Sequence, residues 1–213
     1  MADGMLGSRI GTTTVHLGSQ NLNSVEAGKV TVTTRSHVNH ANYDTNNLNN
    51  DISLLRLPFS ITLGSFIQVV ALPRHSQDSN TFADQAVQVS GWGRTSDTST
   101  GISAELNFVD LNIITNAVCA QTYGTDVIIG STMCASGAGG RSTCNLSTGA
   151  DAFLFQGDSG GPLVITQEGS YLQIGVVSFV SSAGCASGNP SGYVRTTSFL
   201  NWISANTQIS IAD

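Results

Sequence analysis

Apolar and polar side chains alternate over short stretches along most of the chain. A period of two is typical of a β-strand that buries one face, and enrichment in Val and Ile supports that interpretation. Segments rich in Gly, Ser and Asn separate the stretches, without a strand–helix–strand rhythm. The pattern therefore predicts an all-β barrel or sandwich. The expected strands cover residues 12–18, 29–38, 52–57, 85–93, 104–114, 161–167, 171–180 and 192–197.

The pattern changes near the C-terminus, where the apolar spacing becomes that of a helix. We expect this helix to begin at Ser198, whose hydroxyl can cap it, and to continue toward residue 210. Its apolar stripe would consist of Phe199, Leu200, Trp202, Ile203 and Ile209.

Composition excludes several classes of protein. The 213 residues are 40% hydrophobic and 10% charged, which suits one globular unit or two small ones and argues against disorder. The net charge of −6 and the absence of a basic stripe argue against nucleic-acid binding. No apolar run approaches the roughly 18 residues that span a bilayer. We expect neither nucleic acid nor membrane as a partner.

Four cysteines form an even set without the CxxC spacing of zinc or redox sites. Two disulfides formed in an oxidising compartment are the natural interpretation, so we expect a secreted protein. The start of the chain, however, lacks a basic segment followed by an apolar one and is no signal peptide. We interpret this conflict as a truncation upstream of Met1.

Six short motifs then occur in a recognisable order. They are Asn50-Asp51-Ile52-Ser53-Leu54-Leu55, Ser90-Gly91-Trp92-Gly93, Gly157-Asp158-Ser159-Gly160-Gly161-Pro162, Val177-Ser178-Phe179, Pro190-Ser191-Gly192-Tyr193 and Asn201-Trp202-Ile203. With them the chain resembles the chymotrypsin family of serine endopeptidases, most closely the brachyurin-type digestive proteases of arthropods. The resemblance implies two six-stranded antiparallel Greek-key barrels and a C-terminal helix. The expected units are an incomplete first barrel at 1–80, a second barrel at 81–197, and helix and tail at 198–213.

The resemblance also implies the disulfide pairs. Cys119 would pair with Cys134, and Cys144 with Cys185. A further disulfide of the family is missing at both ends, where Val87 and Ile165 stand. The joint loss leaves no orphan thiol and supports the resemblance.

The same family comparison assigns the catalytic residues. A serine hydroxyl becomes a nucleophile when an imidazole accepts its proton and a buried carboxylate orients that imidazole. Ser159 would attack, Asp51 would orient, and the backbone N–H groups of Gly157 and Ser159 would form the oxyanion hole. By itself Asp51 is most simply a capping residue in an Asn-rich loop, and its occurrence together with Ser159 favours the triad role.

The expected substrate pocket contains no carboxylate. The family resemblance implies that Ser142 would lie at its base, Val180 and Ser191 at its walls and Gln156 at its lip. Cleavage after apolar residues, chymotrypsin-like to elastase-like, is therefore expected, unless Val180 and Ser191 are ordinary barrel residues. The neighbouring Ser178 and Phe179 would bind substrate backbone. The expected partners of a monomeric enzyme are polypeptide substrates and protein protease inhibitors.

The general base is the missing component. The family histidine lies in an Ala-His-Cys context, and no such tripeptide occurs in the chain. We do not assign the role to any of the histidines present, which are His16, His37, His40 and His75. The chain as given is therefore expected to be inactive. The alternative is a non-catalytic homologue that serves as a binding or regulatory module.

Two loops depart from the family pattern. Residues 145–156 form an insertion before Gly157, which either covers the specificity site or reflects a misread exon boundary. Residues 19–26 resemble the calcium loop of the family, but Glu26 is their single carboxylate. A calcium cage needs more oxygen ligands than that, so no metal or other cofactor is expected.

Overall fold

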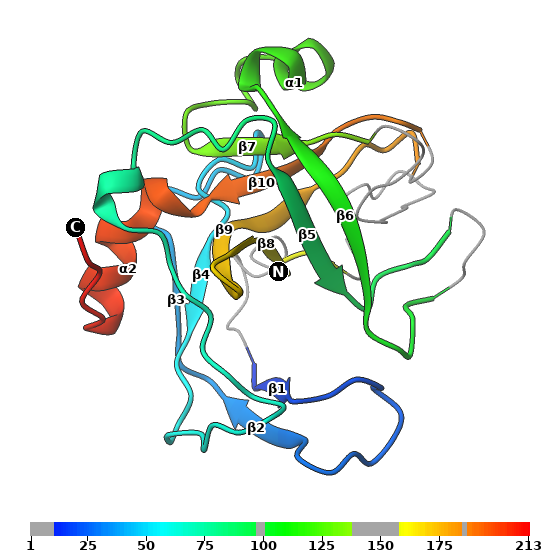
Figure 1. Cartoon of the computed structure of the whole chain (residues 1–213), viewed down its shortest axis with the longest axis vertical. Coiled ribbons are helices and arrows are strands. Elements are labelled where there is room, and N and C mark those ends of the chain that lie inside the picture. Colours follow the sequence, from blue (N-terminus) through cyan, green and yellow to red (C-terminus); the bar gives the residue numbers. More distant parts are fainter. Residues whose placement is uncertain (1–10, 97–100, 138–157, 185–186) are drawn as a thin grey trace.

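The computed structural model describes residues 11–96, 101–137, 158–184 and 187–213. Its main body is a closed barrel of six antiparallel strands in the order β10-β7-β6-β5-β8-β9 (Figure 1). The predicted β-barrel architecture is thus confirmed. The barrel strands are β5 (Ala86–Gly91), β6 (Asn107–Ile114), β7 (Thr132–Ala135), β8 (Pro162–Gln167), β9 (Ser170–Phe179) and β10 (Ser191–Arg195).

The barrel interior explains why most of its strands alternate. In β5, Val87 and Val89 lie in the apolar core, and Gln88 between them is more exposed. Strand β7 has no such alternation, because all four of its residues are buried. Met133 faces the barrel core, and Cys134 packs in a second cluster outside it. The sequence pattern therefore gave no sign of β7.

The N-terminal part forms two smaller antiparallel sheets. One pairs β1 (Thr13–Leu17) with β2 (Val30–Thr34), and the other pairs β3 (His37–Asn39) with β4 (Ser53–Leu55). The stretch predicted as one strand at 29–38 is therefore divided. Within the described residues, these sheets are the counterpart of the expected incomplete first barrel. The predicted domain boundaries themselves remain predictions.

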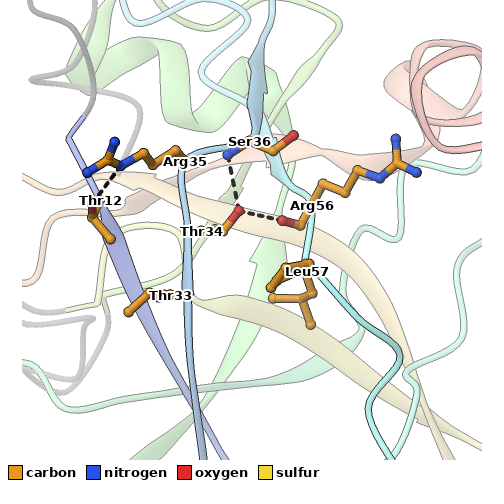
Figure 2. A pocket seen from close by; sticks show the side chains of 8 residues that line it. Thr12, Thr33, Thr34, Arg35, Ser36, Arg56 and Leu57 are labelled. Carbon is orange, nitrogen blue, oxygen red and sulfur yellow. Dashed lines mark hydrogen bonds between the residues drawn. The ribbon is translucent and has the colours of Figure 1, made fainter.

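Polar contacts at the end of β2 join the two small sheets. The Thr34 hydroxyl donates to the Arg56 carbonyl at 2.6 Å and accepts from the Ser36 N–H at 3.1 Å. Figure 2 shows these bonds beside a surface pocket of about 580 Å³. Arg35 extends along one side of this pocket to Thr12, and the Arg56 side chain extends the opposite way. The Thr34 hydroxyl thus couples β2 to the chain that leaves β4.

Two α-helices cover the barrel, and neither is long and apolar enough to cross a membrane within the described part of the chain. Helix α1 (Asn116–Tyr123) begins at Thr115, whose hydroxyl accepts the Val118 N–H. Helix α2 (Leu200–Thr207) follows the 3-10 turn η3 (Thr196–Phe199). The predicted cap is therefore wrong, because Ser198 lies inside η3 and the cap position falls on Phe199. Ile209 lies beyond α2 and is exposed.

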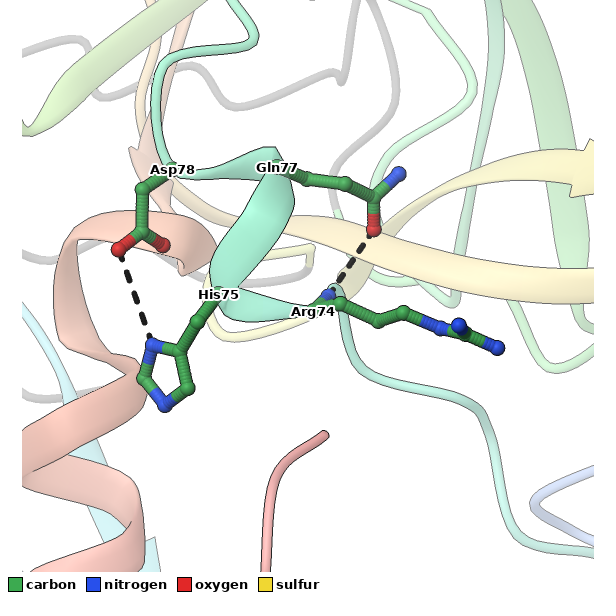
Figure 3. A network of polar contacts seen from close by, with 4 residues as sticks. All are labelled: Arg74, His75, Gln77 and Asp78. Atoms are coloured by element: carbon green, nitrogen blue, oxygen red, sulfur yellow. Dashed lines mark hydrogen bonds and ion pairs between the residues drawn. The ribbon is translucent and has the colours of Figure 1, made fainter. Parts of the chain in front are cut away.

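The connection between the small sheets and the barrel contains one further turn, η1 (His75–Gln77). Figure 3 shows the Gln77 side chain accepting the Arg74 N–H, at 2.9 Å, and His75 Nδ1 facing Asp78 at 3.7 Å. The His75 N–H also donates to the Ala212 carbonyl at 3.0 Å. The connection is thereby fixed to the C-terminal tail.

Candidate active site

Asp51 lies at the junction between the N-terminal sheets and the barrel. Its carboxylate is buried, and Oδ2 accepts a hydrogen bond from the Ser178 hydroxyl at 2.7 Å. The next residue, Ile52, packs in a cluster with Val194 of β10 and Phe199. Because Ile52 is anchored in this cluster and Ser178 is part of β9, the position of Asp51 is fixed from both sides.

Ser159 lies in the turn that leads into β8, and this turn is attached to the same strand. The Gly160 N–H donates to the Val177 carbonyl, and the Val177 N–H donates to the Gly161 carbonyl, each at 2.9 Å. Val177 directly precedes Ser178. Strand β9 therefore links the turn that carries Ser159 to the carboxylate of Asp51, although the two residues are far apart in sequence.

A second carboxylate, that of Asp158, is enclosed by a tight turn at the end of β5. Oδ1 of Asp158 accepts the Gly93 N–H at 2.8 Å. A Cβ atom added to Gly91 would lie 2.0 Å from this oxygen, and one added to Gly93 would lie 2.4 Å from Oδ2. Only glycine fits at either position. Sequence reasoning recognised the Gly-Trp-Gly motif but not that it encloses Asp158.

The described part of the predicted substrate pocket is built from β9 and β10. The Phe179 ring lies against Gly192, where an added Cβ would be 2.1 Å from Cζ. Ser191 is wholly buried, and its hydroxyl lies 2.7 Å from that of Tyr193. Val180 follows Phe179 directly and is half-buried. The structure therefore brings Ser178, Phe179 and Ser191 to neighbouring strand ends.

Tyr123 of α1 supports this wall from outside, and sequence reasoning missed it. Its ring meets Phe179 edge to face with centroids 5.1 Å apart, and its hydroxyl donates to the Pro190 carbonyl. Burial raises the pKa of Tyr123 to about 12, so the phenol stays protonated as a donor. The only available signal was its position near Cys119, which the predicted disulfide to Cys134 fixes against β7.

That disulfide is present, with the two Cα atoms 6.3 Å apart, and the prediction is confirmed. Several other predicted positions lie outside the described residues. They are Ser142, Cys144, the insertion 145–156 with Gln156, Gly157 and Cys185.

The four histidine rings each contact other groups. Burial lowers the pKa of His40 below its ordinary value of 6.5, because its ring packs on the C-terminal aromatic residues. The His16 ring contacts Thr31, and the His37 ring contacts the Arg35 carbonyl. The His40 ring packs on Phe199 and Trp202 and accepts the Asn42 N–H at 3.3 Å. The His75 ring faces Asp78.

Comparison with known proteins agrees with this architecture. The family model described as Trypsin matches residues 7–203. Brachyurin of Leptuca pugilator is 37% identical over 196 residues, covering 92% of this chain and 77% of the relative. Collagenase of Hypoderma lineatum is 37% identical over 182 residues, covering 85% of this chain and 63% of the relative. Chymotrypsin of Phaedon cochleariae is 37% identical over 203 residues, covering 93% and 65% respectively.

The chain thus spans less than two thirds of the length of the last two relatives. Among solved structures, HL collagenase superposes with a TM-score of 0.79 at 35% identity. The superposition covers 94% of this chain and 78% of the other.

Proposed function

The chain belongs to the trypsin family of serine proteases, and we propose that it is a serine endopeptidase domain that cleaves peptide bonds through an acyl-enzyme. The observation that carries this proposal is the link through β9 between Asp51 and the turn of Ser159. A nucleophile and an orienting carboxylate must lie on one side of the same site for triad chemistry.

In the proposed mechanism, Ser159 Oγ attacks the scissile carbonyl carbon while its proton passes to an imidazole. Asp51 orients that imidazole and stabilises the imidazolium, and the Ser178 hydroxyl holds Asp51 in place. The N–H groups of Gly157 and Ser159 stabilise the oxyanion. The imidazolium then protonates the leaving amine, and water attacks the acyl-enzyme in the second half of the reaction.

The proposal assigns the imidazole to none of the four histidines of this chain. Each ring contacts groups other than the proposed triad, and the Ala-His-Cys context is not present. Loss of the base in a related triad costs on the order of a million-fold in kcat. We therefore expect the chain as given to be inactive by itself.

The proposed preference is for apolar residues on the acyl side of the cleaved bond, chymotrypsin-like to elastase-like. It is supported by the lack of a carboxylate at Ser142, Val180 and Ser191. Secretion is proposed from the disulfide, which is stable in an oxidising compartment. Polypeptides and protein protease inhibitors remain the proposed partners of a monomer.

Chemical rescue tests the proposal. Purified chain is incubated with chromogenic peptides that end in Phe, Leu, Ala or Arg, with and without added imidazole. We expect the chromophore to be released from the peptides that end in Phe, Leu or Ala only when imidazole is present. The Ser159→Ala variant should release none. Arg-selective hydrolysis would refute the specificity, and imidazole-independent hydrolysis that requires Ser159 would refute the assignment of the base. No rescue with any peptide would support the non-catalytic homologue instead.

A further inference from the structure

The loop of residues 19–29, which joins β1 to β2, is organised around the Glu26 carboxylate. Oε2 of Glu26 accepts the Gln20 N–H at 2.8 Å, the Ser19 hydroxyl at 3.0 Å and the Asn21 N–H at 3.1 Å. These bonds, with that from Asn21 the largest cause, lower the pKa of Glu26. The carboxylate is thus occupied by donors of its own loop.

The other end of the loop holds an ammonium group. Nζ of Lys29 lies 3.3 Å from the Leu22 carbonyl oxygen, 3.4 Å from that of Ser24 and 3.5 Å from that of Asn21. An ammonium has three donor hydrogens, and three carbonyl oxygens converge on this one. The Lys29 side chain is half-buried, and a turn bond from its own N–H to the Glu26 carbonyl at 3.2 Å keeps it over the loop.

This arrangement decides whether the loop fits the calcium ion that its family resemblance suggests. Calcium takes six to eight oxygen ligands, with carboxylates among them. The single carboxylate of the loop already accepts hydrogen bonds from three internal donors, which are Ser19, Gln20 and Asn21. The carbonyl oxygens left to serve as ligands surround a positive charge, which would repel a second cation. The residues present therefore do not fit a calcium ion.

We propose that the Lys29 ammonium is the resident cation of the 19–29 loop and replaces a metal ion there. The charge that closes the loop is covalently part of the chain. The stability of the folded loop consequently does not depend on the calcium concentration in the surrounding solution.

The loop contacts the part of the barrel that encloses Asp158. The Gln20 carbonyl accepts the Leu106 N–H at 2.8 Å and the indole N–H of Trp92 at 3.2 Å. Trp92 lies between the two glycines that contact the Asp158 carboxylate. An ordered 19–29 loop therefore supports the turn next to the nucleophile segment.

Calcium binding by the unmodified chain is the first test, and it does not depend on the proposed peptidase activity. Isothermal titration calorimetry with calcium chloride should show no saturable binding at millimolar calcium concentrations. The melting temperature should be equal in excess calcium and in excess chelator. Saturable binding accompanied by a rise in melting temperature would overturn the proposal.

Two substitutions then test the ammonium directly. Lys29→Met removes the charge and keeps most of the stem, so its melting temperature should fall by several degrees. The matched control is Arg56→Met, which removes an exposed cation whose side chain points away from Thr34 and Arg35 (Figure 2). Equal melting temperatures for the two variants would contradict the proposal.

Lys29→Glu should convert the three carbonyl oxygens that now surround the ammonium into part of a metal site. This variant should melt lower than the unmodified chain in chelator and recover on addition of calcium, with saturable binding by calorimetry. A folded Lys29→Glu protein that neither binds calcium nor melts higher in its presence would contradict the view that the loop is built around a cation.

Discussion

At the scale of single residues, the proposed triad depends on how the Asp51 carboxylate is held. The hydroxyl of Ser178 is 2.7 Å from it, and both groups are buried. A bond to a buried charge contributes about 1.5–3 kcal/mol. We predict that Ser178→Ala lowers the free energy of unfolding, measured with urea, by that amount. Ser182→Ala, at an exposed position just beyond β9, should cost far less. Similar losses in both would contradict the assigned bond.

A second prediction at this scale concerns pH and Glu26. Hydrogen bonds lower its pKa in the folded chain below the ordinary 4.5, so its contribution to stability is full above 4.5. That contribution disappears as pH falls through the folded-state pKa. The difference in unfolding free energy between the unmodified chain and Glu26→Gln should therefore shrink on acidification below 4.5.

The control for this experiment is Glu168→Gln, the same chemical change at an exposed position. A Glu26→Gln difference that is constant from neutral to acidic pH would rule out the predicted linkage.

Single residues also show what the sequence could and could not predict about the site. Asp51 and Ser159 could be proposed from the sequence because each lies in a local motif. Tyr123 was not, since its contacts to Phe179 and Pro190 join segments that are distant along the chain. The same holds for the glycines that enclose Asp158, because their role depends on a contact across the barrel.

At the scale of elements, alternation predicted strands where one face is covered and the other exposed. Strand β7 was not predicted, because both of its faces are buried and its sequence does not alternate. Helix α1 was not predicted, because its sequence, NAVCAQTY, has no apolar stripe. A cap at Thr115 and the Cys119–Cys134 disulfide stabilise it instead. Helix α2 was expected, but its start was misplaced because the chain forms a 3-10 turn first.

The pairing of β9 with β10 supplies the prediction at this scale. Gly192 leaves room for the Phe179 ring, and an added methyl group would lie 2.1 Å from a ring carbon. Overpacking of this kind costs about 1–3 kcal/mol. Gly192→Ala should lower the free energy of unfolding by this amount. Gly64→Ala, where nothing lies within 4 Å of the added Cβ, is the control. Equal urea midpoints for the two variants would show that the packing of the Phe179 ring does not require glycine at position 192.

At the scale of the whole molecule, two parts of unequal packing meet at the candidate site. The barrel encloses a continuous apolar core, whereas the connection after β4 exposes Phe59, Phe66 and Val69. Asp51 comes from the N-terminal part and Ser159 from the barrel. The sequence could indicate both parts by pattern, but the way they meet rests on the Ile52 cluster and the Ser178 bond.

The central proposal is that Ser159 is a nucleophile whose general base is none of the four histidines of this chain. Treatment with a fluorophosphonate, followed by peptide mapping by mass spectrometry, tests it most directly. Ser159 Oγ would displace fluoride from phosphorus and pass its proton to imidazole. We predict a phosphonyl group on Ser159 when imidazole is present and little without it. Modification of other serines with Ser159 untouched, or equal labelling of Ser159 without imidazole, would contradict the claim.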